Sequence, residues 1–192
     1  MDAKLEGAFL EKMCAYVVSL PFDLDVLQEA VADPDFELAA RELAAGTIVH
    51  TMLPQEGEPG PLRYVDDALL VRAALAKVVT PTSDAATAFR ARFSEIYEKL
   101  DDDVRLFEDC LGELWPWLTG KLPSFPKLAY KGKKPAQCVE DEETAAFLYE
   151  AGQEFKTNYT VTEAQVQNKL RRADQIVEVL QKRRAEELKK RA

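Results

Sequence analysis

The sequence predicts an all-α protein, an irregular bundle of about six or seven helices with a long C-terminal helix. Apolar residues recur every three or four positions in one segment after another, the spacing that lines one face of an α-helix. Prolines, glycines and helix-capping residues separate these segments, and no segment alternates as a strand would. With 192 residues, 47% of them hydrophobic and 31% charged, the chain can bury one substantial core. We therefore expect a helical domain over residues 1–160 and a C-terminal amphipathic helix over residues 161–192.

The charge is acidic overall but uneven along the chain. The formal net charge of −9 argues against a general nucleic-acid binder, because phosphate contacts need clustered cations. Residues 161–192 hold nine Lys or Arg and five Asp or Glu, a net +4 that leaves −13 for the rest of the chain. Such a basic end is compatible with docking on the body of the same chain, with an acidic partner or with weak nucleic-acid contact.

The cysteine and histidine content excludes several classes of site. The three cysteines are widely spaced without a CxxC pair, and the chain has a single histidine. This excludes the usual zinc patterns and argues against a disulfide framework, so we expect a reducing, cytoplasmic compartment. No apolar run approaches the roughly 20 residues that span a bilayer, so no membrane span is expected.

The first third of the chain is predicted to form three helices and a loop. Apolar spacing indicates a helix over residues 3–19, which Pro21 should end. A short second helix over residues 23–32 and a third over residues 33–53 each begin with an aspartate suited to capping. Residues 54–61 contain three prolines and two glycines and are predicted to be a loop.

The next segment, residues 60–79, is the longest strongly apolar run, yet it carries the adjacent Asp66 and Asp67. A helix that is apolar on most sides usually lies in the middle of a bundle. The two aspartates fall in its first turn, where the helix dipole and unpaired amides favour carboxylates. A ligand, a metal ion or a buried ion pair is the alternative role for them.

The following segments continue the helical pattern. Residues 85–111 are predicted to form one long helix with a core-facing apolar stripe, and the three aspartates 101–103 within it are expected to form an exposed acidic patch. Residues 120–137 are rich in proline and lysine and lack periodicity, which indicates a long loop. The loop is either solvated and ordered or contacts an RNA strand or acidic peptide. Its contact candidates are Lys127, Tyr130, Lys131, Lys133 and Lys134.

The last two helices are expected over residues 140–155 and 162–192. The final helix opens with a short seam of coiled-coil rhythm and ends in a basic tip that should project from the body, either free or held by another chain. A protein partner or a second copy is expected on this helix. The predicted partner-binding residues are Val166, Leu170, Ala173, Val177, Leu180, Arg183 and Arg184.

Residues 53–75 resemble a motif of the YkvA-like family of small bacterial helical domains. The motif has an isoleucine-proline-acid start, a Gly/Pro loop, and an aromatic or leucine before a double aspartate that opens an apolar helix. Two departures are Gln55 in place of the acid and Arg63 in place of a glycine. The resemblance extends over about residues 39–78 and implies a compact helical module of unestablished activity. The matching residues are Leu53, Pro54, Gly60, Pro61, Tyr64, Val65, Asp66 and Asp67.

Three function classes follow from these features. The chain has no nucleophile motif, glycine-rich phosphate loop or zinc-protease motif, so we expect a non-enzymatic interaction or scaffold module without a cofactor. One alternative is a divalent-metal protein or hydrolase that uses His50, Asp66 and Asp67, with Glu56 also within reach of His50 across the loop. The other is an RNA- or ribosome-associated protein that binds through the lysines of residues 121–134 and the basic C-terminal helix.

Overall fold

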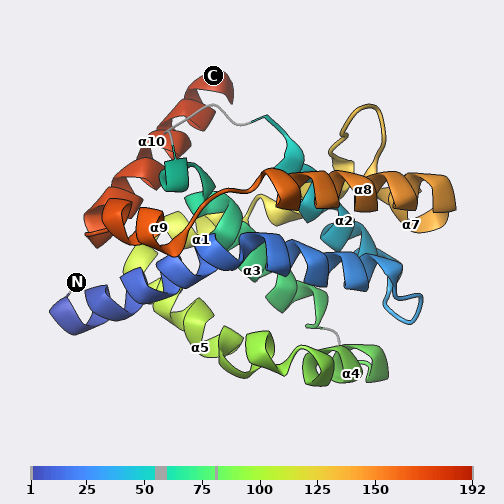
Figure 1. Ribbon diagram of the computed structural model, residues 1–192, viewed down its shortest axis with the longest axis horizontal. Coiled ribbons are helices and arrows are strands. Elements are labelled where there is room, and N and C mark those ends of the chain that lie inside the picture. The colour runs from blue at the N-terminus through green and yellow to red at the C-terminus, as the bar shows by residue number, and fades with distance from the viewer. Residues whose placement is uncertain (1, 55–59, 81, 192) are drawn as a thin grey trace.

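The computed structural model describes residues 2–54, 60–80 and 82–191, and over these residues it is an all-helical bundle (Figure 1). The all-α prediction is confirmed. In chain order the elements are α1 (Ala3–Ala32), α2 (Leu38–Met52), the 3-10 helix η1 (Gly60–Tyr64), α3 (Val65–Val78), α4 (Asp84–Arg92), α5 (Ser94–Leu111), α6 (Leu114–Thr119), the 3-10 helix η2 (Leu122–Lys127), α7 (Pro135–Glu140), α8 (Glu142–Asn158), α9 (Glu163–Lys169) and α10 (Ala173–Arg191).

The predicted number of helices was too low, since the described residues form ten α-helices. Two predicted helices merge into α1, whereas two predicted single helices are each divided, into α4 and α5 and into α9 and α10. The predicted lysine loop is also more ordered than expected, because it contains η2 and the start of α7. No helix within the described ranges is both long and apolar enough to cross a membrane.

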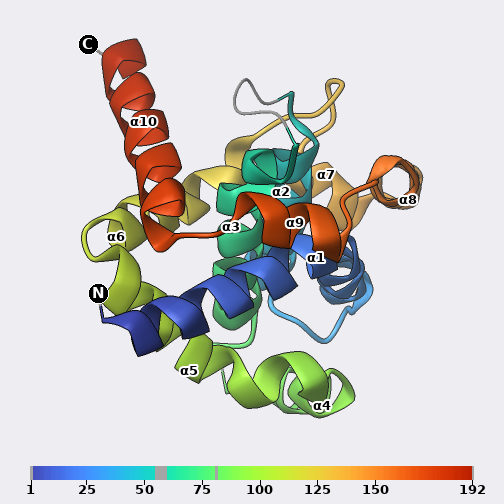
Figure 2. The same ribbon diagram turned by 60° about the vertical axis from the view of Figure 1, so that its left-hand side comes forward.

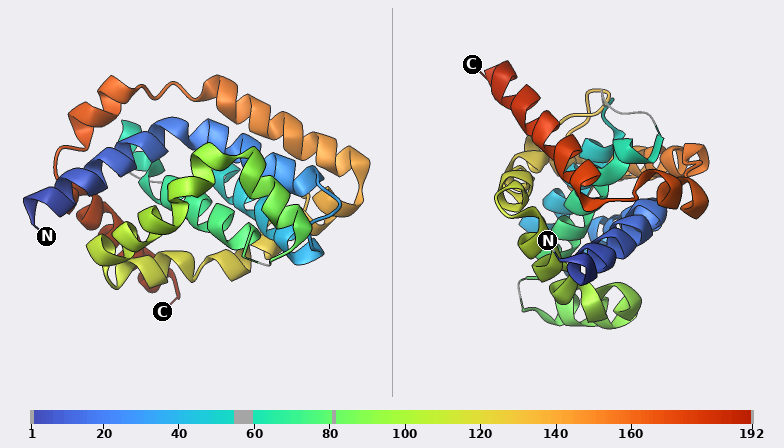
Figure 3. Two further views of the ribbon diagram at one scale, coloured as in Figure 1. Left: turned by 90° about the horizontal axis from the view of Figure 1, so that it is seen from below. Right: turned by 90° about the vertical axis from the view of Figure 1, so that its left-hand side faces the viewer.

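Helix α3 lies at the centre of the bundle, as its apolar sequence predicted (Figures 1 and 2). It packs against α1, α2, α5 and α6, while α8 lies across α1 and α2 on the outside (Figure 3). Helices α9 and α10 return to the end of the molecule at which α1 begins, and the end of α10 extends away from the body (Figure 2). Residues of α9 and α10 belong to the same core cluster as residues of α1 and α3.

Pro21 does not end the first helix, which was predicted to stop there. Proline has no N–H, so in the middle of a helix it leaves the carbonyl four residues earlier without its donor. That carbonyl belongs to Val17, and the Tyr159 hydroxyl after α8 donates a hydrogen bond to it. The tertiary contact supplies the missing donor, and α1 continues to Ala32.

The predicted long helix over residues 85–111 is broken at Phe93, whose backbone leaves the helical conformation with φ −112° and ψ 43°. The break places several aromatic rings together. Phe89 lies 5.1 Å from Phe36 and 4.8 Å from Phe93 between ring centroids. Aromatic packing across elements, which the helical pattern does not reveal, accompanies the change of direction.

The predicted final helix is broken at residues 170–172. Glu6 of α1 accepts a hydrogen bond of 3.0 Å from the amide of Ala173, and Gln175 accepts from the amides of Arg171 and Arg172. These side chains satisfy amides at a new helix start, as N-terminal caps do. The break also changes which side of the helix faces the core. Ile176 is fully buried, whereas Val177, which belonged to the predicted seam, is only partly buried.

A buried ion pair joins the central helix to α1. The guanidinium of Arg72 donates two hydrogen bonds, of 2.7 and 2.8 Å, to the carboxylate of Asp23 and another of 3.1 Å to Ser19. Asp23 is fully buried and Arg72 is 7% exposed. Burial raises the pKa of Asp23 to about 6, against the opposing effect of Arg72.

One residue of the expected acidic patch is buried. Asp101 and Asp102 are exposed as predicted, but Asp103 is 7% exposed and accepts a hydrogen bond from the Tyr16 hydroxyl. Lys12 lies 3.0 Å from the same carboxylate. Asp103 thus joins α5 to α1, because a buried carboxylate needs such partners.

A close contact between α2 and η2 requires a glycine at position 46. A Cβ atom at Gly46 would lie 2.5 Å from the backbone carbon and oxygen of Phe125. No side chain fits there without a shift of the backbone. This contact brings the ring of Phe125 against His50 of α2, with 4.3 Å between the ring centroids and an interplanar angle of 15°.

We expect Gly46→Ala to destabilise the protein by about 1–3 kcal/mol, because the added methyl group overpacks the contact with Phe125. The matched control is Gly7→Ala in α1, where a Cβ would meet nothing within 4 Å. There the higher helix propensity of alanine should stabilise the protein by about 1 kcal/mol. Urea unfolding of both variants measures the two changes, and a neutral or stabilising Gly46→Ala would contradict the close packing.

We expect Arg72→Met to destabilise the protein by about 3–5 kcal/mol, because it leaves the buried carboxylate of Asp23 without its cation. The double variant Arg72→Met/Asp23→Leu removes both charges and should be more stable than Arg72→Met alone. Thermal and urea unfolding measure this order. A double variant that loses the sum of the two single losses would show that the pair is not coupled.

The raised pKa of Asp23 makes the stability of the folded protein depend on pH. The folded state holds the proton of Asp23 more tightly than the unfolded state, so its contribution to stability is lost as the pH rises from about 4 through about 6. The stability of Asp23→Asn relative to the wild type should therefore improve as the pH rises across this range, and urea unfolding at several pH values measures this.

Candidate functional site

A pocket of about 350 Å³ opens beside the first turn of α3. Its walls come from the end of α2, from η1, from α3, from the loop before α7 and from the last turns of α8. Polar and aromatic side chains from these elements converge in it. The lining residues are Thr51, Met52, Leu53, Pro54, Arg63, Tyr64, Asp67, Tyr130, Ala151, Glu154, Phe155, Asn158 and Tyr159.

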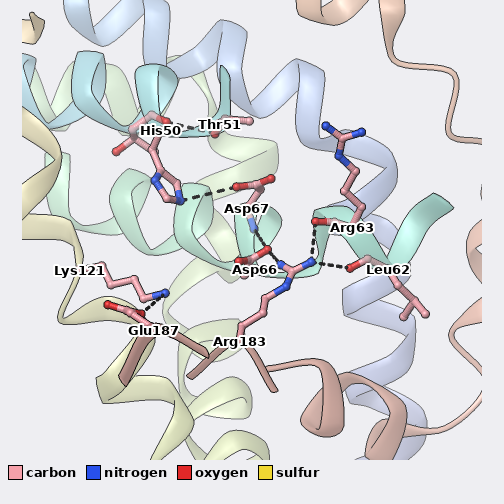
Figure 4. A network of polar contacts seen from close by, with 10 residues as sticks. His50, Thr51, Leu62, Arg63, Asp66, Asp67, Lys121, Arg183 and Glu187 are labelled. Atoms are coloured by element: carbon pink, nitrogen blue, oxygen red, sulfur yellow. Dashed lines mark hydrogen bonds and ion pairs between the residues drawn. The ribbon is translucent and has the colours of Figure 1, made fainter. Parts of the chain in front are cut away.

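The two adjacent aspartates of α3 have different partners. Asp66 forms an ion pair with Arg183 of α10, and its Oδ1 also accepts a hydrogen bond of 3.1 Å from the amide of Asp67 (Figure 4). Arg183 further donates to the backbone carbonyls of Leu62 and Arg63, at 3.4 and 3.1 Å. Asp66 therefore attaches the C-terminal helix to the start of the central helix.

Asp67 turns toward His50 and the pocket. Its Oδ1 lies 3.8 Å from His50 Nε2, beyond hydrogen-bonding distance, and its side chain is 2% exposed (Figure 4). Burial, followed by the positive charge of Lys121, lowers the pKa of His50 to about 4, while Glu187 opposes the change. His50 is accordingly neutral at pH 7 and stacks on Phe125 as an aromatic ring.

A second ion pair lies near that of Asp66 with Arg183 (Figure 4). Lys121 Nζ is 3.0 Å from a carboxylate oxygen of Glu187, and it lies 3.9 Å from the centroid of the Trp117 ring. The ion pair holds α10 beside the junction of α6 and η2, and the cation–π contact fixes Lys121 against α6. Figure 4 shows Lys121–Glu187 and Arg183–Asp66 as two adjacent links to α10.

The predicted metal ligands lie close together but are engaged in other contacts. Asp66 is paired with Arg183, and His50 is stacked on a ring. Among the described residues, no group of three His, Cys, Asp or Glu side chains is placed to hold a metal ion. Glu56, the other acid considered for this site, lies outside the described residues.

The predicted lysine contacts are spread along the segment between α6 and α8. Lys127 is the last residue of η2, whereas Tyr130 and Lys133 pair through their backbones in an isolated bridge. Lys131 has a positive φ of 48° and lies over the Tyr130 ring at 5.1 Å. Lys127, Lys131 and Lys134 are exposed, while Lys133 is partly buried.

The predicted partner-binding seam lies inside this chain. Val166, Leu170, Ala173 and Leu180 are buried in the core that α1 and α3 share, and Val177 packs against it. The start of the basic tip is held by its own chain, whereas the tip was expected to be free or held by another chain. Arg183 pairs with Asp66, and Arg184 lies 3.9 Å from Glu113.

The sequence did not identify the α8 side of the pocket. Glu154, Phe155 and Tyr159 lie at or just after the end of α8, which was predicted as a helix over residues 140–155 without a site. The sequence shows only that residues 154–159 contain one acid and two aromatic residues. That these residues line a pocket follows from their contact with Tyr64 and Asp67, which are distant in the chain. The partner of Asp66 was also missed, because Arg183 is 117 residues away in the chain.

Comparison of the chain with protein-family models, curated proteins and solved structures finds no match. The resemblance of residues 39–78 to the YkvA-like family therefore stays a prediction.

We expect the imidazole of His50 to titrate near pH 4 instead of near 6.5. His50 is the single histidine of the chain, so NMR of its ring protons reports this pKa without overlap. The unfolded state binds the proton more readily, so stability should fall by up to about 3 kcal/mol as the pH drops from 6.5 to about 4. The control His50→Gln should lack this component, and a titration near 6.5 would contradict the buried, stacked position.

Proposed function

We propose that the protein is a non-enzymatic interaction module whose partner-binding element is the end of α10. The supporting observation is that this end extends from the body while two ion pairs anchor it there (Figure 2). A helix that is held in place and exposed beyond its anchors loses little conformational entropy on binding.

The exposed side chains of this end have a basic and apolar character. Leu188 is 57% exposed, and Lys189 and Lys190 beside it are exposed. Residues 182–192 contain six Lys or Arg and two Asp or Glu, which gives +4. The positive excess of the C-terminal region therefore lies entirely in this tip, since residues 161–181 contain three of each sign.

A partner with an acidic surface and a small apolar contact fits this tip best. Charge complementarity accelerates such an encounter, and the exposed leucine can contribute apolar contact at its centre. The apolar seam of Val166, Leu170, Ala173 and Leu180 is engaged within the chain. We accordingly propose that the partner contact lies on the part of the tip beyond the anchoring residues Arg183 and Glu187.

RNA is the second candidate partner. The contact of Lys121 with Glu187 brings the start of the lysine-rich segment beside α10, so that two basic regions adjoin. Phosphate binding by these regions would weaken strongly with salt.

We test the proposal with a photo-crosslinking amino acid at position 188 in cells, compared with the same amino acid at Phe22, which is 41% exposed on α1. A defined crosslinked species is expected from position 188 alone. It should disappear in Lys189→Glu/Lys190→Glu and persist in Lys99→Glu, a charge reversal at an exposed position of α5.

The nature of the species decides between the candidates. A species that resists ribonuclease and contains a second polypeptide, either a second copy or another protein, supports the interaction module. Sensitivity to ribonuclease would instead identify RNA as the partner. Equal crosslinking from positions 188 and 22, or none from 188, would overturn the proposal.

A further inference from the structure

The pocket beside α3 has the dimensions of a small-molecule site. Its volume of about 350 Å³ lies within the usual range for ligand pockets, about 300–1,000 Å³. Five segments of the chain contribute to its walls, and the ion pair of Asp66 with Arg183 fixes the η1 side. A cavity of this kind is shaped by the fold before any ligand arrives.

Three aromatic rings form one wall of the pocket. The centroid of Tyr159 lies 4.8 Å from that of Tyr64 and 5.4 Å from that of Phe155. Tyr64 and Phe155 are 6.2 Å apart and nearly perpendicular, at 88°. Rings in such an arrangement present faces and edges at different angles, and each face carries partial negative charge that attracts a cation.

The polar group of Tyr159 is already in use. Its hydroxyl donates to the carbonyl of Val17, the one that Pro21 leaves without a donor. The structural role fixes the ring in position and leaves its π system as the part that can meet a ligand. Ring faces suit a ligand that needs electrostatic attraction but few hydrogen bonds.

Two carboxylates complete the pocket. The side chain of Asp67 is 2% exposed and lines the pocket from α3, and Glu154 lines it from α8. Burial, then the neighbouring Tyr64 and Asp67, raise the pKa of Tyr159, so the negative charge of Asp67 is felt at the aromatic wall. Together the acids and rings make the interior attractive to positive charge.

Arg63 is the one cationic side chain among the residues that line the described pocket. It is exposed, and its guanidinium lies 5.6 Å from the centroid of the Tyr64 ring. Figure 4 shows it pointing away from Asp66 and Asp67. Arg63 thus demonstrates that the Tyr64 face accepts a cation, and it competes with any cation that enters.

We propose that the pocket bounded by Tyr64, Phe155, Tyr159 and Asp67 binds an organic ammonium cation. The rings supply cation–π attraction and the buried carboxylate supplies the counter-charge. Quaternary ammonium groups are recognised by this combination of features elsewhere in proteins. Arg63 sets the affinity by its competition for Tyr64.

The test uses choline as the probe and 3,3-dimethylbutan-1-ol, its uncharged isostere, as the matched ligand control. Isothermal titration calorimetry on the full-length chain should show saturable binding of choline. Because the two molecules have the same shape, the alcohol should bind at least tenfold more weakly if charge carries the recognition. Equal binding of both, or no binding of choline up to 50 times the protein concentration and 10 mM, would overturn the proposal.

Variants test whether choline binds in this pocket and whether the two carboxylates contribute to its binding. Asp67→Asn and Glu154→Gln should each weaken choline binding severalfold, whereas Glu150→Gln, one turn earlier on an exposed face of α8, should leave it unchanged. Circular dichroism and thermal unfolding verify that each variant is folded. If Asp67→Asn does not fold, the exposed Glu154→Gln carries the same test, and unchanged binding in it would contradict the site.

Arg63→Ala separates cation from anion binding. It should tighten choline binding about two- to fivefold, because it removes the competing guanidinium from Tyr64. A pocket for anions would instead bind inorganic phosphate and lose it in this variant, and that result would overturn the proposal. These measurements do not involve the tip of α10, so their outcome is independent of the interaction function.

Discussion

Arg72 can lie inside the bundle only because Asp23 faces it from α1. Two charges removed from water are tolerated in a protein interior when they pair with good geometry, and the bidentate contact meets that condition. The central helix has a second charge to neutralise at its start, where Asp66 meets Arg183 of α10. Helices α1, α3 and α10 are thereby placed relative to one another by the requirement that the polar residues of a buried helix find partners.

Several side chains from the C-terminal third bind backbone groups of helices in the N-terminal third of the chain. Tyr159 supplies the hydrogen bond that Pro21 removes from α1, and Arg183 binds the carbonyls that precede α3. In the opposite direction, Glu6 caps the start of α10. These contacts and the shared core make α9 and the first half of α10 part of the body, although the apolar residues of this region were expected to bind a partner.

The two proposed surfaces have η1 in common. Arg183, which anchors the exposed tip, contacts the backbone of Arg63, while the side chain of Arg63 lines the pocket. Neutral His50 lies near Asp67, and burial and the charge of Lys121 disfavour its protonation. The two aspartates of α3 have different roles, since Asp66 pairs with Arg183 of α10 and Asp67 lines the pocket.

Local signals in the sequence were sufficient for the class of the fold and for many of its helices. Apolar spacing predicted the core faces, and the all-round apolar character of residues 60–79 predicted a central helix with Asp66 and Asp67 in its first turn. Both aspartates and His50 were singled out as neighbours, and they are neighbours in the structure.

Partners distant in the chain decided the rest. Pro21 lies inside a helix because of Tyr159, the last helix breaks where Glu6 caps it, and the seam residues face their own core. Arg183 and Glu154 carry no local pattern that assigns them to Asp66 or to a pocket. Helical periodicity is a property of neighbouring residues, so the sequence by itself determined which faces are buried, whereas only the tertiary structure decided what each buried charge and each ring meets.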